Sequence, residues 1–371
     1  MPTHTSEYFQ YTKNDSLQSV YYTFTPKPIT GGNHYAIDEE LSSLLIETHR
    51  ALGILEGMTI YMPDKEILRD IMLLKESSFS IQIDCLDFDF YSALEKRGCG
   101  KDIGVEQNIM SAYISAFRMG NGINMLSDIC SIALYGSDSS ERTSIRTNQM
   151  LITDMFSNMK RYNPTAPTHI HLALTDMLKY LENDTSDILV KAALVHYQFE
   201  MIHPFECYNG VVGRILTSMI LRNIYSNATD YLCISKALFN AKNDYFDILT
   251  ATQKHGGYLL WIKFFVRQIL ESARHSTEQI RQCHEIIRCD EARIDTHPTS
   301  TANTRDIYSF YKKYLVSGVK HPAVHLQLAY TTSQNAVKIL QDLDILRQTS
   351  SGARNKCFVY HELVEILVGK I

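Results

Sequence analysis

The chain of 371 residues lacks several features that would place it in a class at once. It has no apolar run near the roughly 20 residues that a membrane-spanning helix needs, and its polar first residues contain no signal-peptide core. Its net charge of −5 is small for its length, so composition indicates neither a nucleic-acid nor a membrane partner. We therefore expect a cytoplasmic protein without a membrane partner.

Paired cysteine motifs are also missing. The sequence has eight cysteines, but none of them form a C-x-x-C pair. Such pairs are typical of structural zinc sites and redox centres. We therefore expect reduced thiols and no metal site built from cysteine.

Helical periodicity is what the chain has in abundance. Hydrophobic residues make up 45% of it, enough for a large core. Apolar residues recur at helical spacing in many segments, whereas strand signals are few, so the sequence predicts a mainly α fold. The expected helices lie at about 38–52, 63–74, 168–182, 187–202, 214–226, 241–254 and 258–275, with two more within 105–133 and a short strand or hairpin at 145–152.

The last part of the chain, residues 306–371, has a different character. Two short helical segments joined by a turn, 323–329 and 331–343, precede a hairpin. This order resembles a winged helix-turn-helix, with Gln334, Asn335 and Lys338 placed where base contacts would be made. The segment is only weakly basic, so DNA binding stays open beside protein contact and dimerisation.

The most informative segment runs from His203 to Arg214 and reads H-P-F-E-C-Y-N-G-V-V-G-R. A histidine can move a proton near neutral pH, and glycines allow backbone N–H groups to approach an anion. Pro204 favours an extended backbone at His203, and a helix starting near Arg214 would carry a partial positive charge at its first turn. The segment predicts a phosphate site beside a general base.

This segment resembles the motif of the Fic family, H-x-F-x-(D/E)-G-N-G-R-x-x-R. His203, Phe205, Asn209, Gly210 and Arg214 match that motif. Family members usually transfer AMP from ATP to a hydroxyl group of a target protein. The resemblance extends over roughly residues 40–275 and implies a Fic-type helical bundle with a small β-hairpin flap.

The resemblance implies roles for the matching residues. His203 would take the proton from a Ser, Thr or Tyr hydroxyl of a protein target, which then attacks the α-phosphate of ATP. Arg214 would bind a terminal phosphate. Asn209, Gly210 and Gly213 would line the anion site, and Tyr245 would pack on the adenine. The plainer alternatives are an ion pair, a tight turn and a core aromatic residue.

Three positions depart from the family motif. Cys207 stands where the family has the acid that holds Mg²⁺, Tyr208 replaces a glycine, and Val211 replaces the first arginine. Mg²⁺ prefers oxygen ligands, so its use here is doubtful. Loss of one electrostatic group in such a site typically costs about 10²–10³ in rate. Two hypotheses follow: an impaired or altered adenylyltransferase, or an inactive pseudoenzyme that binds a nucleotide or a partner and regulates through the winged helix.

Two further segments complete the resemblance. Ser80-x-x-x-Asp84 is similar to the inhibitory helix of many Fic proteins, which implies that Asp84 lies within reach of Arg214. The flap would include Ile152, Thr153, Asp154 and Met155 and would present a strand edge to a target peptide.

The sequence therefore predicts four regions. They are an N-terminal extension with an inhibitory-type helix (1–104), a Fic core (105–275), a connecting helix and linker (276–305) and a winged-helix domain (306–371). The target, the transferred group and the formation of a homodimer are left open.

Overall fold

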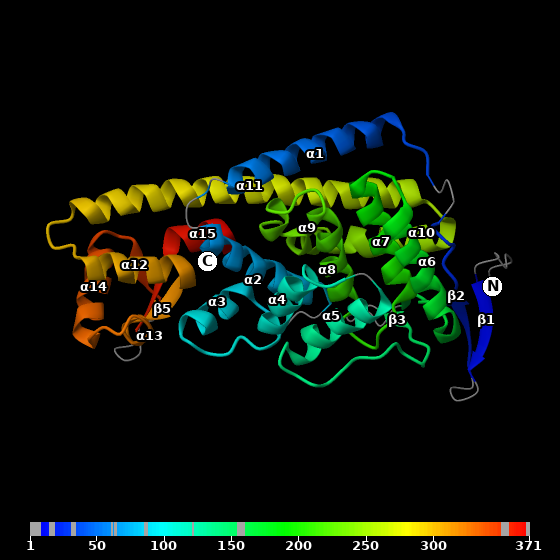
Figure 1. Ribbon diagram of the computed structural model, residues 1–371, viewed down its shortest axis with the longest axis horizontal. Helices are drawn as coiled ribbons and strands as arrows, with labels where there is room; N and C mark the ends of the chain where they lie inside the picture. Colours follow the sequence, from blue (N-terminus) through cyan, green and yellow to red (C-terminus); the bar gives the residue numbers. More distant parts are fainter. Residues whose placement is uncertain are drawn as a thin grey trace.

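A computed structural model describes residues 9–14, 19–30, 35–60, 62, 65–84, 88–120, 122–153, 160–349 and 356–368. The expected mainly α class is confirmed (Figure 1). The α-helices are α1 (Glu39–Ile60), α2 (Lys65–Asp84), α3 (Phe90–Gly98), α4 (Val105–Ala116), α5 (Ile123–Tyr135), α6 (Ile170–Asn183), α7 (Ile188–Ile202), α8 (Asn209–Arg222), α9 (Ile234–Asn240), α10 (Lys242–His255), α11 (Tyr258–Thr296), α12 (Ala302–Tyr314), α13 (Lys320–His325), α14 (Tyr330–Asp342) and α15 (His361–Val368). The 3-10 helices are η1 (Pro167–His169) and η2 (Ala228–Asp230), and the strands are β1 (Phe9–Asn14), β2 (Ser19–Phe24), β3 (Ile152–Thr153), β4 (Lys160–Tyr162), β5 (Val316–Gly318), β6 (Leu346–Gln348) and β7 (Cys357–Tyr360).

Helix α7 lies at the centre of the core. Almost all of its side chains are buried, as expected for a helix that is apolar on every face. Helix α8 follows directly in the chain and packs along it. Within the described ranges no helix is long and apolar enough to cross a membrane.

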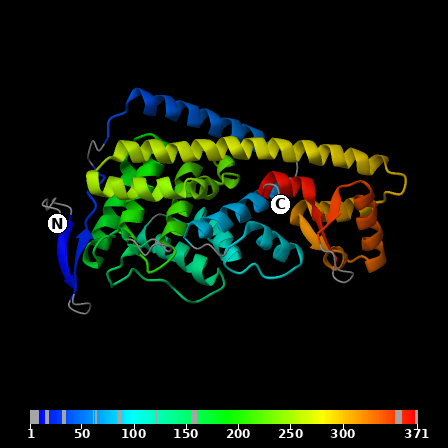
Figure 2. The same ribbon diagram turned by 180° about the vertical axis from the view of Figure 1, so that it is seen from behind.

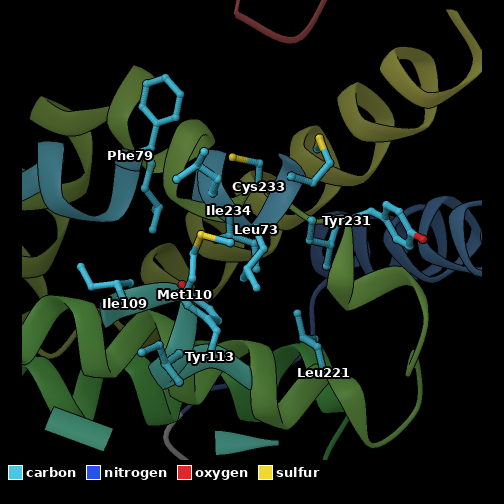
Figure 3. Close-up of a cluster of buried hydrophobic side chains, with 14 of the residues drawn as sticks. Leu73, Phe79, Ile109, Met110, Tyr113, Leu221, Tyr231, Cys233 and Ile234 are labelled. Atoms are coloured by element: carbon cyan, nitrogen blue, oxygen red, sulfur yellow. The ribbon is translucent and has the colours of Figure 1, made fainter. Parts of the chain in front are cut away.

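Helix α2 packs the N-terminal extension onto the motif region. It packs on α4, α8 and α9. Figure 3 shows part of this packing, where Leu73 and Phe79 of α2 lie among Met110, Tyr113 and Cys233. The side chains of α2 are mostly buried, except near the two ends of the helix, so α2 is a core element.

Helix α11 is a single helix of 39 residues. No glycine or proline interrupts it, so the chain continues as a helix past the domain boundary expected at 275/276. The helix expected at 258–275 thus ended too early, and the connecting helix expected within 276–305 is its direct continuation. Figures 1 and 2 show α11 running along almost the whole molecule, with α1 beside its first half and the C-terminal elements at its far end.

The C-terminal elements form a small unit around a three-stranded antiparallel sheet of order β5-β7-β6. Helices α12, α13 and α14 pack beside it. The expected pair of short helices and the strands flanking a turn are thus in place, although α12 begins at Ala302, ahead of the boundary expected at 306. The assignment of this unit as a winged helix stays a prediction.

The flap hairpin begins later than expected. Residues 145–151 form no strand, and β3 starts at Ile152 and pairs with β4. The expected strand at Arg146 does not form because its amide and guanidinium groups bond to loop carbonyls. Asp154 and Met155 of the expected flap lie outside the described residues.

Candidate active site

His203 ends α7 in a left-handed backbone conformation with φ of 49°. Its N–H donates to the Phe199 carbonyl at 2.8 Å, a helix-terminating contact. The extended backbone expected from the following proline was therefore wrong. The left-handed residue satisfies an end carbonyl of α7, which an extended residue would leave open.

Arg146 fixes this strained turn from the neighbouring loop. Its Nε donates to the His203 carbonyl at 2.7 Å, and its backbone N–H donates to the Pro204 carbonyl at 2.9 Å. The guanidinium group also reaches the carbonyls of Ile202 and Thr165. Arg146 is 3% exposed, so these hydrogen bonds are shielded from water. Sequence reasoning missed this role of Arg146, because it lies outside the matched motif.

The imidazole of His203 is nearly buried. Burial lowers its pKa to about 3, and the charge of Arg146 adds to the effect, against the opposing backbone carbonyl of Glu200. The ring is therefore neutral at neutral pH and able to accept a proton. Its Nδ1 lies 3.9 Å from Glu200 Oε2, and the Tyr162 ring meets it edge-on.

Helix α8 begins at Asn209, one turn earlier than the start expected near Arg214. The Asn209 side chain causes the early start, because its Oδ1 accepts from the Phe205 N–H at 2.9 Å and its Nδ2 donates to the Phe205 carbonyl at 2.8 Å. The amide side chain is thus occupied by the turn. Only the backbone at the helix start remains to meet an anion, and no described residue accepts from the N–H of Gly210 or Val211.

The two motif glycines face opposite ways. A Cβ atom on Gly210 would lie 2.8 Å from both Arg214 Nη1 and Asp84 Oδ2. A Cβ atom on Gly213 would instead lie 3.1 Å from Glu200 Oε1 and close to Phe199 of α7. Gly213 therefore allows close packing of α8 on α7, and a role of its backbone at an anion site stays a prediction.

Arg214 is 1% exposed and is held by α2. Its Nε donates to Ser80 Oγ at 2.8 Å, and its Nη2 donates to the Ser80 carbonyl at 2.7 Å and to Asp84 Oδ2 at 2.8 Å. The expected contact between Asp84 and Arg214 is present. Arg214 Nη1 has no hydrogen-bond partner among the described residues.

The carboxylate of Asp84 thus lies at the first turn of α8, where an anion is favoured. Burial would lower the pKa of Arg214, but the charges of Asp84, Tyr245 and Glu200 together outweigh it and the pKa is raised. Asp84 itself is 42% exposed in its side chain. The pair therefore joins a buried cation to an acid that solvent can reach.

Glu200 is a buried acid that the motif analysis missed. Burial raises its pKa to about 7, although the Arg214 charge opposes this. Its Oε2 accepts from the Tyr162 hydroxyl at 3.2 Å. The available sequence signal was a lone acid in the otherwise apolar helix α7, three residues before His203.

Tyr245 lies in the aromatic core and is 1% exposed. Its hydroxyl is 2.9 Å from His196 Nε2, and its ring packs against Trp261 and Phe246. This placement favours the core alternative over contact with an adenine.

The three departing positions lie around the start of α8. Cys207 is exposed, Tyr208 caps the helix with φ of 63°, and Val211 is 2% exposed. Burial raises the pKa of the Cys207 thiol, so it stays protonated at neutral pH. In the part of the chain that the structure describes, no group of three His, Cys, Asp or Glu side chains could hold a metal ion. The residues at this site do not fit Mg²⁺.

Residues 125–221 match the model of the Fic/DOC family. The protein adenylyltransferase fic-1 of Caenorhabditis briggsae is 30% identical over 91 residues, which are 24% of this chain and 17% of that protein. A probable protein adenylyltransferase of Aquifex aeolicus is 36% identical over 70 residues, which are 19% of this chain and 22% of that protein. The chain thus spans about a fifth of the length of these relatives.

A solved structure resembles the chain over a longer range. The crystal structure of a Fic family protein from Desulfovibrio desulfuricans covers 88% of this chain and 98% of its own, with a TM-score of 0.59 and 16% identity. At that identity the likeness shows the fold alone.

Proposed function

We propose that this chain, whose residues 125–221 match the Fic/DOC family, transfers AMP from ATP to a hydroxyl group of a protein. One observation carries the proposal. A neutral histidine lies beside a helix start at which a buried arginine, Arg214, holds a carboxylate in the place suited to a phosphate. The names of the curated relatives agree with this activity.

In the proposed reaction, His203 takes the proton from a Ser, Thr or Tyr hydroxyl of the target. The hydroxyl oxygen bonds to the α-phosphorus of ATP, and the bond from that phosphorus to the bridging oxygen of the β-phosphate breaks. Pyrophosphate leaves with the negative charge. Nδ1 of His203 faces Glu200, so Nε2 is the atom that receives the proton.

Arg214 supplies the positive charge for the departing phosphates in this proposal. Its Nη1 has an open donor, and the N–H groups of Gly210 and Val211 point out of the first turn of α8. Asp84 competes with the nucleotide for this place, so it acts as an inhibitory acid. ATP binding requires the Asp84 side chain to move away from Arg214.

The proposed transfer proceeds without the metal that the family uses. Cys207 and Val211 supply neither the oxygen ligand nor the second cation of the family motif, so we expect a slow basal rate. The same two residues favour a second candidate, in which the protein binds a nucleotide without transferring it.

The test compares transfer before and after Asp84 is removed. The full chain is incubated with ATP labelled at the α-phosphate, and incorporation into the protein is measured. Asp84→Gly should raise incorporation at least tenfold, and Asp84→Asn should raise it in part, because it removes the charge and keeps the shape. His203→Ala in the Asp84→Gly background should abolish the gain.

Asp342→Gly is the matched control, since Asp342 is an exposed acid at the last position of another helix, α14. It should leave incorporation unchanged. A folded Asp84→Gly protein that binds ATP more tightly but incorporates no label would establish the binding candidate. Unchanged ATP affinity would contradict both candidates.

A further inference from the structure

A cavity lies away from His203, where α2, α9, α11 and α15 meet. Its volume is about 420 Å³, within the range of small-molecule sites. Polar side chains of three helices line it, including Lys75, Lys236 and His275, and apolar residues of α9 and α15 form another wall. The cavity therefore offers both cationic and apolar surface.

Lys75 of α2 is the most unusual lining residue, because it is a lysine that is only 1% exposed. Its Nζ donates to Gln279 Oε1 at 2.9 Å. An ammonium group has three N–H donors, and no other described residue accepts from it. A buried charge with unfilled donors is costly unless a counter-charge reaches it.

The neighbouring acid does not supply that counter-charge. The Glu76 carboxylate makes its hydrogen bonds elsewhere, accepting from Tyr113 and from the hydroxyl and N–H of Ser235. Glu271 is the one acid that lines the cavity, but its side chain is 60% exposed and lies 3.8 Å from Arg274. Lys75 therefore has no acidic partner among the described residues.

Lys236 of α9 places a second ammonium group at this cavity. It lies 4.2 Å from the centre of the Phe79 ring, and no described acid lies within 4.0 Å of it. Burial lowers the pKa of both lysines. A buried and a half-buried ammonium group at one cavity create a local positive potential that a divalent anion would neutralise.

We propose that this cavity binds a small organic phosphate ester, with its phosphate group between Lys75 and Lys236 and its organic part against the wall formed by α15. A phosphate ester fits because it is close to a dianion near neutral pH, and because Leu367 and Ile366 give the cavity an apolar side. His275 at the cavity edge provides a further donor.

The position of Lys75 couples the cavity to the candidate active site through α2. Lys75 lies on α2, the same helix that carries Ser80 and Asp84 against Arg214. A ligand that draws Lys75 towards the cavity would bias that helix. This consequence rests on the proposed function, whereas binding at the cavity does not.

Binding is tested by calorimetry on the full chain with glucose 6-phosphate, inorganic phosphate and glucose. The sugar phosphate should bind at one site per chain, inorganic phosphate more weakly and glucose not at all. Lys236→Gln should weaken the binding of glucose 6-phosphate at least tenfold. Lys254→Gln, which changes an exposed lysine of α10, should change it less than twofold.

Lys75→Met should abolish binding, and if this variant does not fold, Lys236→Gln carries the test alone. Three results would overturn the proposal: no binding of either phosphate, equal binding of glucose, or equal loss in Lys236→Gln and Lys254→Gln. Asp84→Gly separates this site from the one at α8. It should leave the affinity for glucose 6-phosphate within threefold, and a larger gain would place the ligand at Arg214 instead.

Discussion

The side chains around His203 make more hydrogen bonds with backbone groups than with one another. Arg146 bonds to carbonyls on both sides of the turn, and Asn209 closes a ring with Phe205. Both side chains bond to the main chain, which keeps the base and the helix start in one geometry. The cost of losing either side chain therefore falls on several buried carbonyl and N–H groups at once.

Arg146→Met should lower the free energy of unfolding by about 3 kcal/mol or more, because each buried carbonyl left without a donor costs about 1–3 kcal/mol. Urea denaturation measures the change. Arg142→Met is the matched control, since Arg142 is exposed and bonds to carbonyls of its own surface turn. A similar, small loss in both variants would mean that Arg146 does not hold the turn.

Glu200 makes stability depend on pH in a predictable direction. Its pKa is about 7 in the folded protein against an ordinary value of 4.5, so the folded state binds more protons between these values. Stability from this group therefore falls as pH rises through that window. The difference corresponds to at most about 3 kcal/mol.

The substitution Glu200→Gln should remove this loss of stability with rising pH. Relative to the unmodified protein, we expect the variant to gain stability as pH is raised from 4.5 to 7.5, as followed by urea midpoints. Glu206→Gln, at an exposed acid near the same turn, controls for the loss of one carboxyl group. A stability difference for Glu200→Gln that stays constant with pH would contradict the assigned shift.

At the scale of elements, the site is the meeting of α2 with the start of α8. The pair of Arg214 and Asp84 lies directly over Gly210, which has room for no side chain. Glycine is required at this position by the close approach of two charged groups. The contact couples the N-terminal extension to the motif region through a few atoms.

A double-mutant cycle measures this coupling. Gly210→Ala should be more destabilising in the unmodified chain than in Asp84→Gly, by about 0.5–3 kcal/mol, because removal of Asp84 gives the new methyl group space. Urea denaturation of the four proteins gives the value. Additive effects of the two substitutions would show that Gly210 and Asp84 do not meet.

The sequence predicted helices better than it predicted their ends and contacts. Helical periodicity located α7 and α10 nearly to their observed bounds. It placed the start of α8 one turn late, because the capping ring of Asn209 is formed only in three dimensions. The periodicity ended α11 too early, because residues such as Ile287 are buried by contacts with the C-terminal unit.

The residues of the candidate site were likewise predicted only in part. The resemblance of Ser80-x-x-x-Asp84 to the inhibitory helix of Fic proteins led to the contact with Arg214, and the four-residue spacing places both side chains on one face of α2. Arg146 and Tyr162 escaped notice because nothing local distinguishes them from structural residues, and the acid Glu200 within α7 was a signal that the motif analysis did not use. Burial supplies their properties, and burial is set by the fold.

At the scale of the whole molecule, the C-terminal unit contacts α2, α3 and α11, and hydrogen bonds hold it at two of these places. One is α11, where Asp290 accepts from the Tyr360 hydroxyl at 2.7 Å. The other is Gly98 of α3, whose carbonyl lies 2.8 Å from His321 Nδ1 and accepts from Ser317 Oγ. A Cβ atom on Gly98 would overlap the Val316 carbonyl.

Gly98→Ala should therefore detach α3 from β5. We expect a loss of about 1–3 kcal/mol or more in unfolding free energy and faster proteolysis at residues 297–301. Gly57→Ala serves as control, because its methyl group would meet nothing within 4 Å and helix propensity favours alanine by about 0.5–1 kcal/mol. Equal stability and equal cleavage rates for the two variants would contradict this docking contact.

The uninterrupted helix α11 turns these two contacts into a closed frame. Helix α11 joins the core to the C-terminal unit. That unit in turn contacts α3 and α2, which pack on the same core. A helix turns by about 100° and advances about 1.5 Å with every residue. One residue inserted in the middle of α11 would rotate the C-terminal unit out of line with α3, so the length of α11 is fixed by geometry. Length changes are tolerated instead in the loop 298–301, outside the frame.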